Sequence, residues 1–121
     1  MFSISPAILD LYQGVPSGSV TVTYTVPSYG VQYTIPSGPV EEFDNMDVFS
    51  IGQCGIGFNG IKTAPASLGP FTFGFQLVLN TNAYHWVNAN PGDTFFGFYG
   101  LYLLQNGSPI DYVRAEVRAH K

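Results

Sequence analysis

The clearest pattern along the chain is a strict alternation of apolar and polar positions. In residues 19–26 every even position is Val or Tyr and every odd position is Ser or Thr. In residues 71–80 the odd positions are all Phe or Leu. In residues 112–119, Val and Ala at odd positions alternate with Tyr, Arg and Glu at even ones. Each run predicts a strand with one buried face, and the polar face of the last run is expected at solvent or at an interface.

Residues 94–104 differ because both faces of this segment are apolar. The even positions provide Phe96, Phe98, Tyr102 and Leu104, and the odd positions provide Phe95, Tyr99, Leu101 and Leu103. A strand that is apolar on both faces is typical of the centre of a sheet covered on both sides. The pattern therefore predicts a central strand with neither face in water.

Glycine, proline and asparagine punctuate these runs. The Asn-Gly pairs at 59–60 and 106–107 predict two-residue hairpin turns, because both residues tolerate positive φ. Asn-Pro-Gly-Asp at 90–93 fits a type II turn. Shorter strands are expected at residues 30–35, 46–52 and 84–87, and residues 56–62 are expected to continue as a hairpin around Asn59-Gly60.

The N-terminal segment leaves two interpretations open. Ser5 suits a helix N-cap, Pro6 suits the first helical position and Gly14 suits the position after a helix, so residues 4–14 fit a short helix. The alternative is an extended arm over residues 1–14. In either form this segment is the one we expect to reach towards a neighbouring subunit.

The spacing of these elements predicts the fold class. Seven or eight short strands, separated by turn signals at intervals of 8–12 residues, are typical of an all-β antiparallel sandwich. A jelly-roll-like and an Ig-like arrangement both fit. With 121 residues the chain has the size of a single domain, 1–121, that can bury a core without disulfides. The single cysteine, Cys54, is expected to be a small core residue.

The scarcity of charge changes this picture. Lys and Arg number four and Asp and Glu eight, and between Lys62 and Asp111 the only charged residue is Asp93. Surfaces that always face protein need few charges, so we expect a non-enzymatic structural protein that forms a homo-oligomer or joins a larger assembly. The net charge of −4 argues against a nucleic-acid partner.

Motifs for catalysis or for metal and cofactor binding are weak. Residues 55–60 match G-x-G-x-x-G, but prolines follow where a dinucleotide site needs a helix, which favours a glycine-rich hairpin. His85 and Cys54 have no metal-finger spacing and no nucleophile motif. The acidic run at 40–47 lacks a calcium-loop pattern and is expected to be an exposed loop that favours solubility. No enzyme, metal or cofactor is therefore predicted.

One segment combines the side chains that bind sugars. An aromatic ring can stack on a sugar face while amides and carboxylates bond its hydroxyl groups. The candidate residues are His85, Trp86, Asn88, Asn90 and Asp93. A small lectin-like glycan-binding module is therefore the alternative function.

A short, charge-poor β chain rich in Gly and Phe is similar in type to small virion components such as head-decoration proteins, and to small oligomeric bacterial lectins. The N-terminal residues lack the basic and apolar regions of a signal peptide, and no apolar stretch is long enough for a transmembrane helix. These features predict synthesis in the cytoplasm and no membrane partner, and the resemblance implies assembly into a particle such as a virion.

Overall fold

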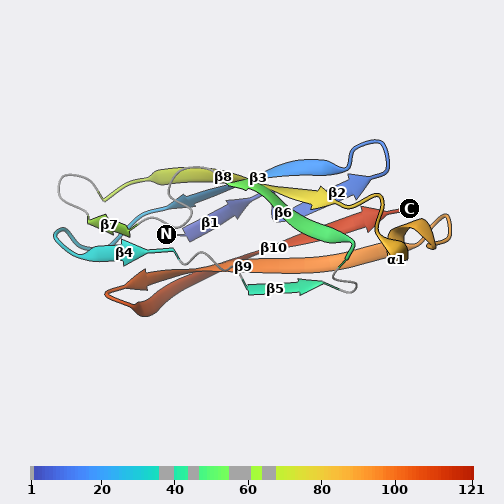
Figure 1. Ribbon diagram of the computed structural model, residues 1–121. Coiled ribbons are helices and arrows are strands. Elements are labelled where there is room, and N and C mark those ends of the chain that lie inside the picture. The colour runs from blue at the N-terminus through green and yellow to red at the C-terminus, as the bar shows by residue number, and fades with distance from the viewer. Residues whose placement is uncertain (1, 36–39, 44–46, 55–60, 64–67) are drawn as a thin grey trace.

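Almost all regular structure in the molecule is β-strand (Figure 1). A computed structural model describes residues 2–35, 40–43, 47–54, 61–63 and 68–121. The first sheet has the strand order β1-β3-β8-β6, and the second has the order β2-β10-β9-β4-β7 with β5 also paired to β9. The strands are β1 Phe2–Ser5, β2 Ile8–Tyr12, β3 Ser17–Tyr24, β4 Gln32–Thr34, β5 Val40–Phe43, β6 Phe49–Cys54, β7 Ile61–Thr63, β8 Phe71–Leu79, β9 Thr94–Gln105 and β10 Ser108–His120.

The all-β prediction is confirmed, while the details differ. Ten strands lie within the described residues, against the seven or eight expected. The pairing is antiparallel except that β2 lies parallel to β10. Residues 4–14 form no helix: β1 pairs with β3 in the first sheet, and β2 pairs with β10 in the second. Pro6 and Ala7 separate these two strands, so the N-terminal segment joins both sheets of its own chain.

Two further predictions of local structure are wrong. Residues 84–87 form a single helical turn, α1 Tyr84–Val87, instead of a strand. The acidic run at 40–47, expected to be an exposed loop, instead contributes β5, which pairs with β9. The hairpin expected over residues 56–62 falls largely on residues that the structure does not describe; within the described part, β6 pairs with β8 and β7 pairs with β4 in the other sheet. The Asn-Gly pair at 59–60 lies outside the described residues.

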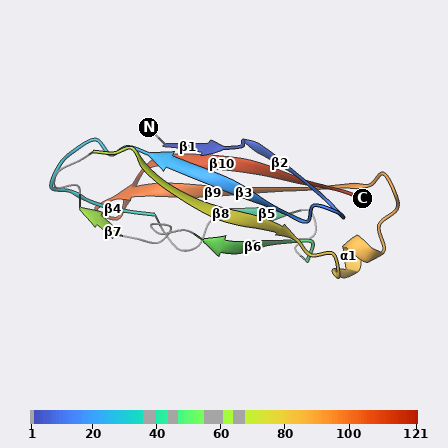
Figure 2. The same cartoon turned by 90° about the horizontal axis from the view of Figure 1, so that it is seen from above.

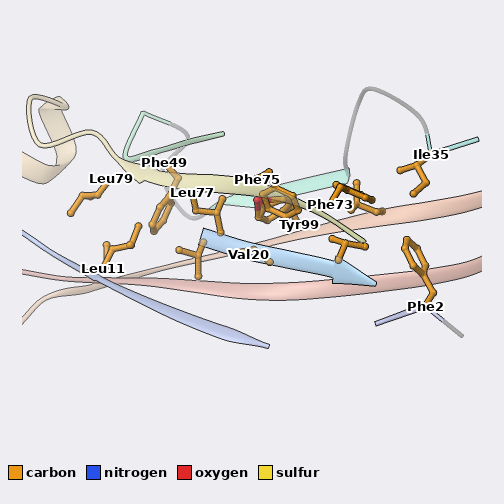
Figure 3. Packing of buried hydrophobic residues seen from close by; sticks show 14 of the residues in the cluster. Phe2, Leu11, Val20, Ile35, Phe49, Phe73, Phe75, Leu77, Leu79 and Tyr99 are labelled. Carbon is orange, nitrogen blue, oxygen red and sulfur yellow. The ribbon is translucent and has the colours of Figure 1, made fainter. Parts of the chain in front are cut away.

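The core lies between the two sheets, whose ribbons overlap when the molecule is seen from above (Figure 2), and its side chains follow the predicted alternation (Figure 3). The even side chains of residues 20–26 and the odd side chains of residues 73–79 are buried. From the second sheet, Tyr99, Leu101 and Leu103 are each at most 2 % exposed. The Phe75 ring lies 4.8 Å from the Tyr99 ring, measured between centroids, which joins β8 to β9 across the core.

The β9–β10 hairpin is the longest element of the molecule. Its turn residues Asn106 and Gly107 have φ of 49° and 85°, which confirms the two-residue turn. Gln105 pairs with Ser108 and Leu104 with Pro109, after which a register shift between Pro109 and Asp111 inserts Ile110 as an extra residue. This β-bulge pairs Tyr102 with Tyr112, and it thereby directs the odd residues of both strands to the core.

Removing the aromatic contact between the sheets should destabilise the protein strongly. For Phe75→Ala we expect a loss of about 3–5 kcal/mol in the free energy of unfolding, the usual cost of emptying a buried aromatic site. Urea denaturation followed by circular dichroism measures it. Tyr29→Ala is the control, because Tyr29 is 59 % exposed and its change should stay within about 0.5 kcal/mol. Equal small effects of both changes would contradict the assigned core.

Candidate functional site

The predicted sugar-binding segment is built around α1. Ala83 and Trp86 both point inwards at a spacing of three residues, whereas Tyr84, His85 and Val87 are exposed. The N–H of Val87 donates to the carbonyl of Ala83 at 2.9 Å, which closes the helical turn. Aromatic and β-branched residues favoured a strand here, but burial of one large ring overrides that preference.

Trp86 is the anchor of this end of the molecule and is fully buried. Its indole Nε1 donates to Gln13 Oε1 at 2.7 Å, and its ring lies 5.9 Å from the Phe95 ring. Lys121 Nζ donates to the Trp86 carbonyl at 2.9 Å and lies 4.9 Å from the indole centroid. The ring therefore joins α1 to the β2–β3 turn and to the C-terminal residue, and it offers no face for a sugar to stack on.

His85 lies on the surface and is paired with Asp47. Its backbone N–H donates to Asp47 Oδ2 at 3.2 Å, and its Nδ1 lies 2.7 Å from Asp47 Oδ1. Desolvation alone raises the pKa of Asp47, but the hydrogen bonds from the His85 backbone and ring and the charge attraction of that ring outweigh it, and the pKa lies below its ordinary value. The pair ties α1 to the segment before β6.

The other three predicted residues hold the loop itself. Asn88 Nδ2 donates to the Tyr84 carbonyl at 2.9 Å, and Asp93 Oδ2 accepts from the Asn90 N–H at 2.9 Å. Gly92 has φ of 95° and the Asp93 N–H donates to the Asn90 carbonyl, which confirms the type II turn. The five predicted residues thus share one loop, while glycan binding by that loop stays a prediction.

A second surface was predicted only in part from the sequence, which placed the even residues of 112–119 at solvent or at an interface but expected residues 94–104 to be covered on both sides. The outer side of the second sheet carries aromatic and apolar side chains together with both charge signs, and we call it the aromatic–arginine face. It comprises Ile8, Asp10, Tyr12, Phe96, Phe98, Tyr102, Tyr112, Arg114, Glu116, Arg118 and His120. The expectation that β9 is covered on both sides is therefore wrong within one chain, because Phe96 is 39 % and Tyr102 38 % exposed.

Planar groups pack against one another along this face. The Tyr102 and Tyr112 rings lie 4.7 Å apart, and the guanidinium of Arg114 lies 4.4 Å from the Phe98 ring centroid. The guanidinium of Arg118 lies 5.9 Å from the Phe96 ring. These contacts follow from the cross-strand register and hold the side chains in one arrangement.

Glycine makes one of these contacts sterically possible. The Tyr112 ring crosses the strand at Gly100, and a methyl group at that position would overlap with the phenol. The absence of a side chain at 100 therefore lets Tyr112 lie flat on the sheet. A glycine within an otherwise bulky strand was the sequence signal for this close approach.

The edge of the face at β2 is closed by a second histidine–aspartate pair. His120 Nε2 lies 2.7 Å from Asp10 Oδ1, and the Tyr12 ring stacks on the imidazole with centroids 5.0 Å apart. Arg118 donates to Glu116 at 2.9 Å beside it. Arg114, by contrast, has no carboxylate partner among the side chains that the structure describes.

Some sequence candidates fall where the structure gives no description. The G-x-G-x-x-G run at 55–60 lies outside the described residues, as do Asp44 and the side chains of Glu41, Glu42 and Cys54. In the parts that are described, no three His, Cys, Asp or Glu residues come together as a metal site would require. The described part also contains no helix of sufficient length and apolarity to cross a membrane.

Comparison with known proteins shows similarity of fold to solved structures but does not assign the chain to a family. No family model and no curated protein matches the sequence. Among solved structures, the periplasmic chaperone SfaE has a TM-score of 0.65 at 10 % identity, over 99 % of this chain and 57 % of that one. The YadV chaperone has a TM-score of 0.57 at 7 % identity, over 98 % of this chain and 51 % of that one.

The chain therefore spans little more than half the length of the two chaperones that it resembles. The CooA pilin subunit from enterotoxigenic Escherichia coli has a TM-score of 0.49 at 14 % identity, over 98 % of this chain and 97 % of that one. At such identities the likeness concerns the fold alone.

The hydrogen bond to Trp86 should stabilise this end of the molecule. In Gln13→Leu the buried indole N–H loses its acceptor, which should lower the free energy of unfolding by about 1–3 kcal/mol. Thermal unfolding followed by the fluorescence of this single tryptophan measures the change. In Gln13→Glu an acceptor remains, so most of the stability should return; equal losses in both variants would contradict the role of the bond.

The His85–Asp47 pair should make the free energy of unfolding depend on pH in the acidic range. Because the pKa of Asp47 is lower in the folded chain than its unfolded value of about 3.9, the pair stabilises above that pH, and this contribution is lost as the pH falls through the folded pKa. Denaturant unfolding of the wild type and Asp47→Asn across acidic pH should therefore show a stability difference that shrinks towards low pH. A difference that stays constant would contradict the assigned shift.

Proposed function

We propose that this chain is a non-enzymatic assembly protein that binds protein through its aromatic–arginine face, with a second copy of itself as the first partner. The observation that supports this proposal most directly is that large side chains are exposed on one rigid side of the second sheet. Ile8, Tyr12 and Tyr112 are 45 %, 49 % and 42 % exposed, in addition to Phe96 and Tyr102.

The composition of this face supports binding of protein. Tyr, Phe and Arg are enriched at the centre of protein interfaces, whereas Lys is depleted there. The face contains two arginines and no lysine among its members, and its rings are already packed against the guanidinium groups. Little side-chain freedom is then left to lose on association, which favours affinity.

Its charges support a second copy as the partner. Arg114 and Arg118 lie on the same surface as Asp10 and Glu116, so the face carries both signs. Two copies related by a two-fold axis can place each sign of one copy opposite the other sign. Arg114 is the group that such a partner would neutralise.

The fold comparison supports an assembly role in a general way. We propose that the two sheets form an Ig-like sandwich. Two structures of similar fold are chaperones, and the order β1-β3-β8-β6 in one sheet, with β9 between β10 and β4 in the other, follows the strand order of that class. The name of one neighbour, a periplasmic chaperone, favours exported protein partners over a virion.

The glycan alternative has weaker support. With Trp86 buried, a sugar at residues 84–93 would have to stack on Tyr84, which is 72 % exposed, next to His85. Asn88, Asn90 and Asp93 already bond within the loop. We therefore favour the assembly role.

Sedimentation equilibrium of the intact chain tests the proposal. We expect the wild type to self-associate between micromolar and millimolar concentrations. Phe96→Lys combined with Tyr102→Lys should raise the dissociation constant at least about tenfold, which corresponds to about 1.4 kcal/mol. Both substitutions lie at exposed positions, so circular dichroism should show that the fold is kept.

The matched control is Tyr29→Lys combined with Val87→Lys. It changes the net charge equally at positions that are 59 % and 58 % exposed but lie off the aromatic–arginine face. It should leave the dissociation constant unchanged. A wild type that is monomeric at every concentration, or equal effects of the two double variants, would refute self-association through this face.

A further inference from the structure

The turn of the β9–β10 hairpin lies at the end of the molecule opposite α1 (Figure 1). Beside this turn is a cavity of about 320 Å³. The segment after β3 and both strands of the β9–β10 hairpin contribute to its wall. Thr25, Val26 and Pro27 follow β3, whereas Leu103 and Gln105 come from β9 and Ile110 and Asp111 from β10. Its volume lies at the lower end of the range of small-ligand sites.

The β-bulge in β10 shapes this cavity. The register shift between Pro109 and Asp111 makes Ile110 the extra residue of the strand, and its side chain is 43 % exposed. A bulge redirects side chains that a regular ladder would hold in line, and bulges are over-represented next to binding sites. Here the bulge places an apolar side chain and a carboxylate at one opening.

The carboxylate of Asp111 has capacity left for a ligand. Its Oδ1 accepts a hydrogen bond from the Tyr112 N–H at 2.8 Å, and no ion pair joins it to a described side chain. Three of the four basic residues are engaged elsewhere: Arg114 on the Phe98 ring, Arg118 on Glu116 and Lys121 on the Trp86 carbonyl.

We propose that this cavity binds a primary ammonium or guanidinium group carried on an apolar stem. The head group would donate hydrogen bonds to Asp111 and to the side-chain oxygen of Gln105, and the stem would lie against Leu103, Ile110 and Pro27. A Lys or Arg side chain of a protein partner and a free alkylamine share this chemistry. The net charge of −4 adds a general attraction for cations.

Titrations of the isotope-labelled chain followed by amide NMR shifts test the proposal. The probes are n-butylammonium, N-acetyl-lysine methylamide and the uncharged n-butanol. We expect saturable shifts at Leu103, Gln105 and Ile110 with either cation and much weaker ones with butanol. Saturation with butylammonium indicates a free-amine site, and saturation with the lysine amide alone indicates a side-chain site; both support the proposal.

Two isosteric variants supply the control. Asp111→Asn should raise the dissociation constant for the cation at least threefold, whereas Asp47→Asn removes the same charge beside α1, away from the cavity and from the aromatic–arginine face, and should leave it unchanged. Equal effects of the two variants, equal binding of butanol, or no saturable shift with any probe would overturn the proposal. None of these readouts involves the aromatic–arginine face, so self-association and this site can fail independently.

Discussion

The register of the β9–β10 hairpin is the constraint on which both the core and the aromatic–arginine face depend. A two-residue turn at Asn106 and Gly107 pairs Gln105 with Ser108, an odd position with an even one. The extra residue Ile110 then restores odd with odd, which sends Val117 and Tyr99 to the core. Because a slip of one residue exchanges the two faces of a strand, turn and bulge together determine which side chains meet solvent.

The same hairpin connects the two surfaces proposed for binding. The bulge that sets the register also opens the cavity beside Asp111, and the strand beyond it displays Tyr112 and Arg114 on the outer side. The stretch between Lys62 and Asp111, in which Asp93 is the only charged residue, thus contains two kinds of apolar position. Within β9, the odd residues Tyr99, Leu101 and Leu103 fill the chain's own interior, whereas the even residues Phe96 and Tyr102 are exposed. Only the exposed even residues support a role in assembly.

Alternation along single strands was readable from the sequence, because burial of one face imposes a period of two. The strands containing Val20, Phe75 and Val117 were predicted correctly for this reason. The pairing of strands far apart in the sequence could not be predicted. No local sequence feature indicates that β7 lies beside β4, or that β2 lies parallel to β10. The strand predicted at residues 84–87 was wrong because burial of the Trp86 ring outweighs the local preference for a strand. The sequence did contain a signal for the bulge. A two-residue turn at 106–107 pairs odd positions of one strand with even positions of the other, whereas the apolar pattern puts odd positions of both strands in the core. One extra residue is needed to satisfy both.

The central claim is that the outer side of β9 and β10 meets protein in the native state. Hydroxyl-radical footprinting of the unmodified chain over a range of concentrations tests it most directly, with Tyr29 as the internal reference. We expect Phe96, Tyr102 and Tyr112 to become protected as the protein concentration rises, while the reactivity of Tyr29 stays constant. Reactivity of all four rings that does not change with concentration would contradict it.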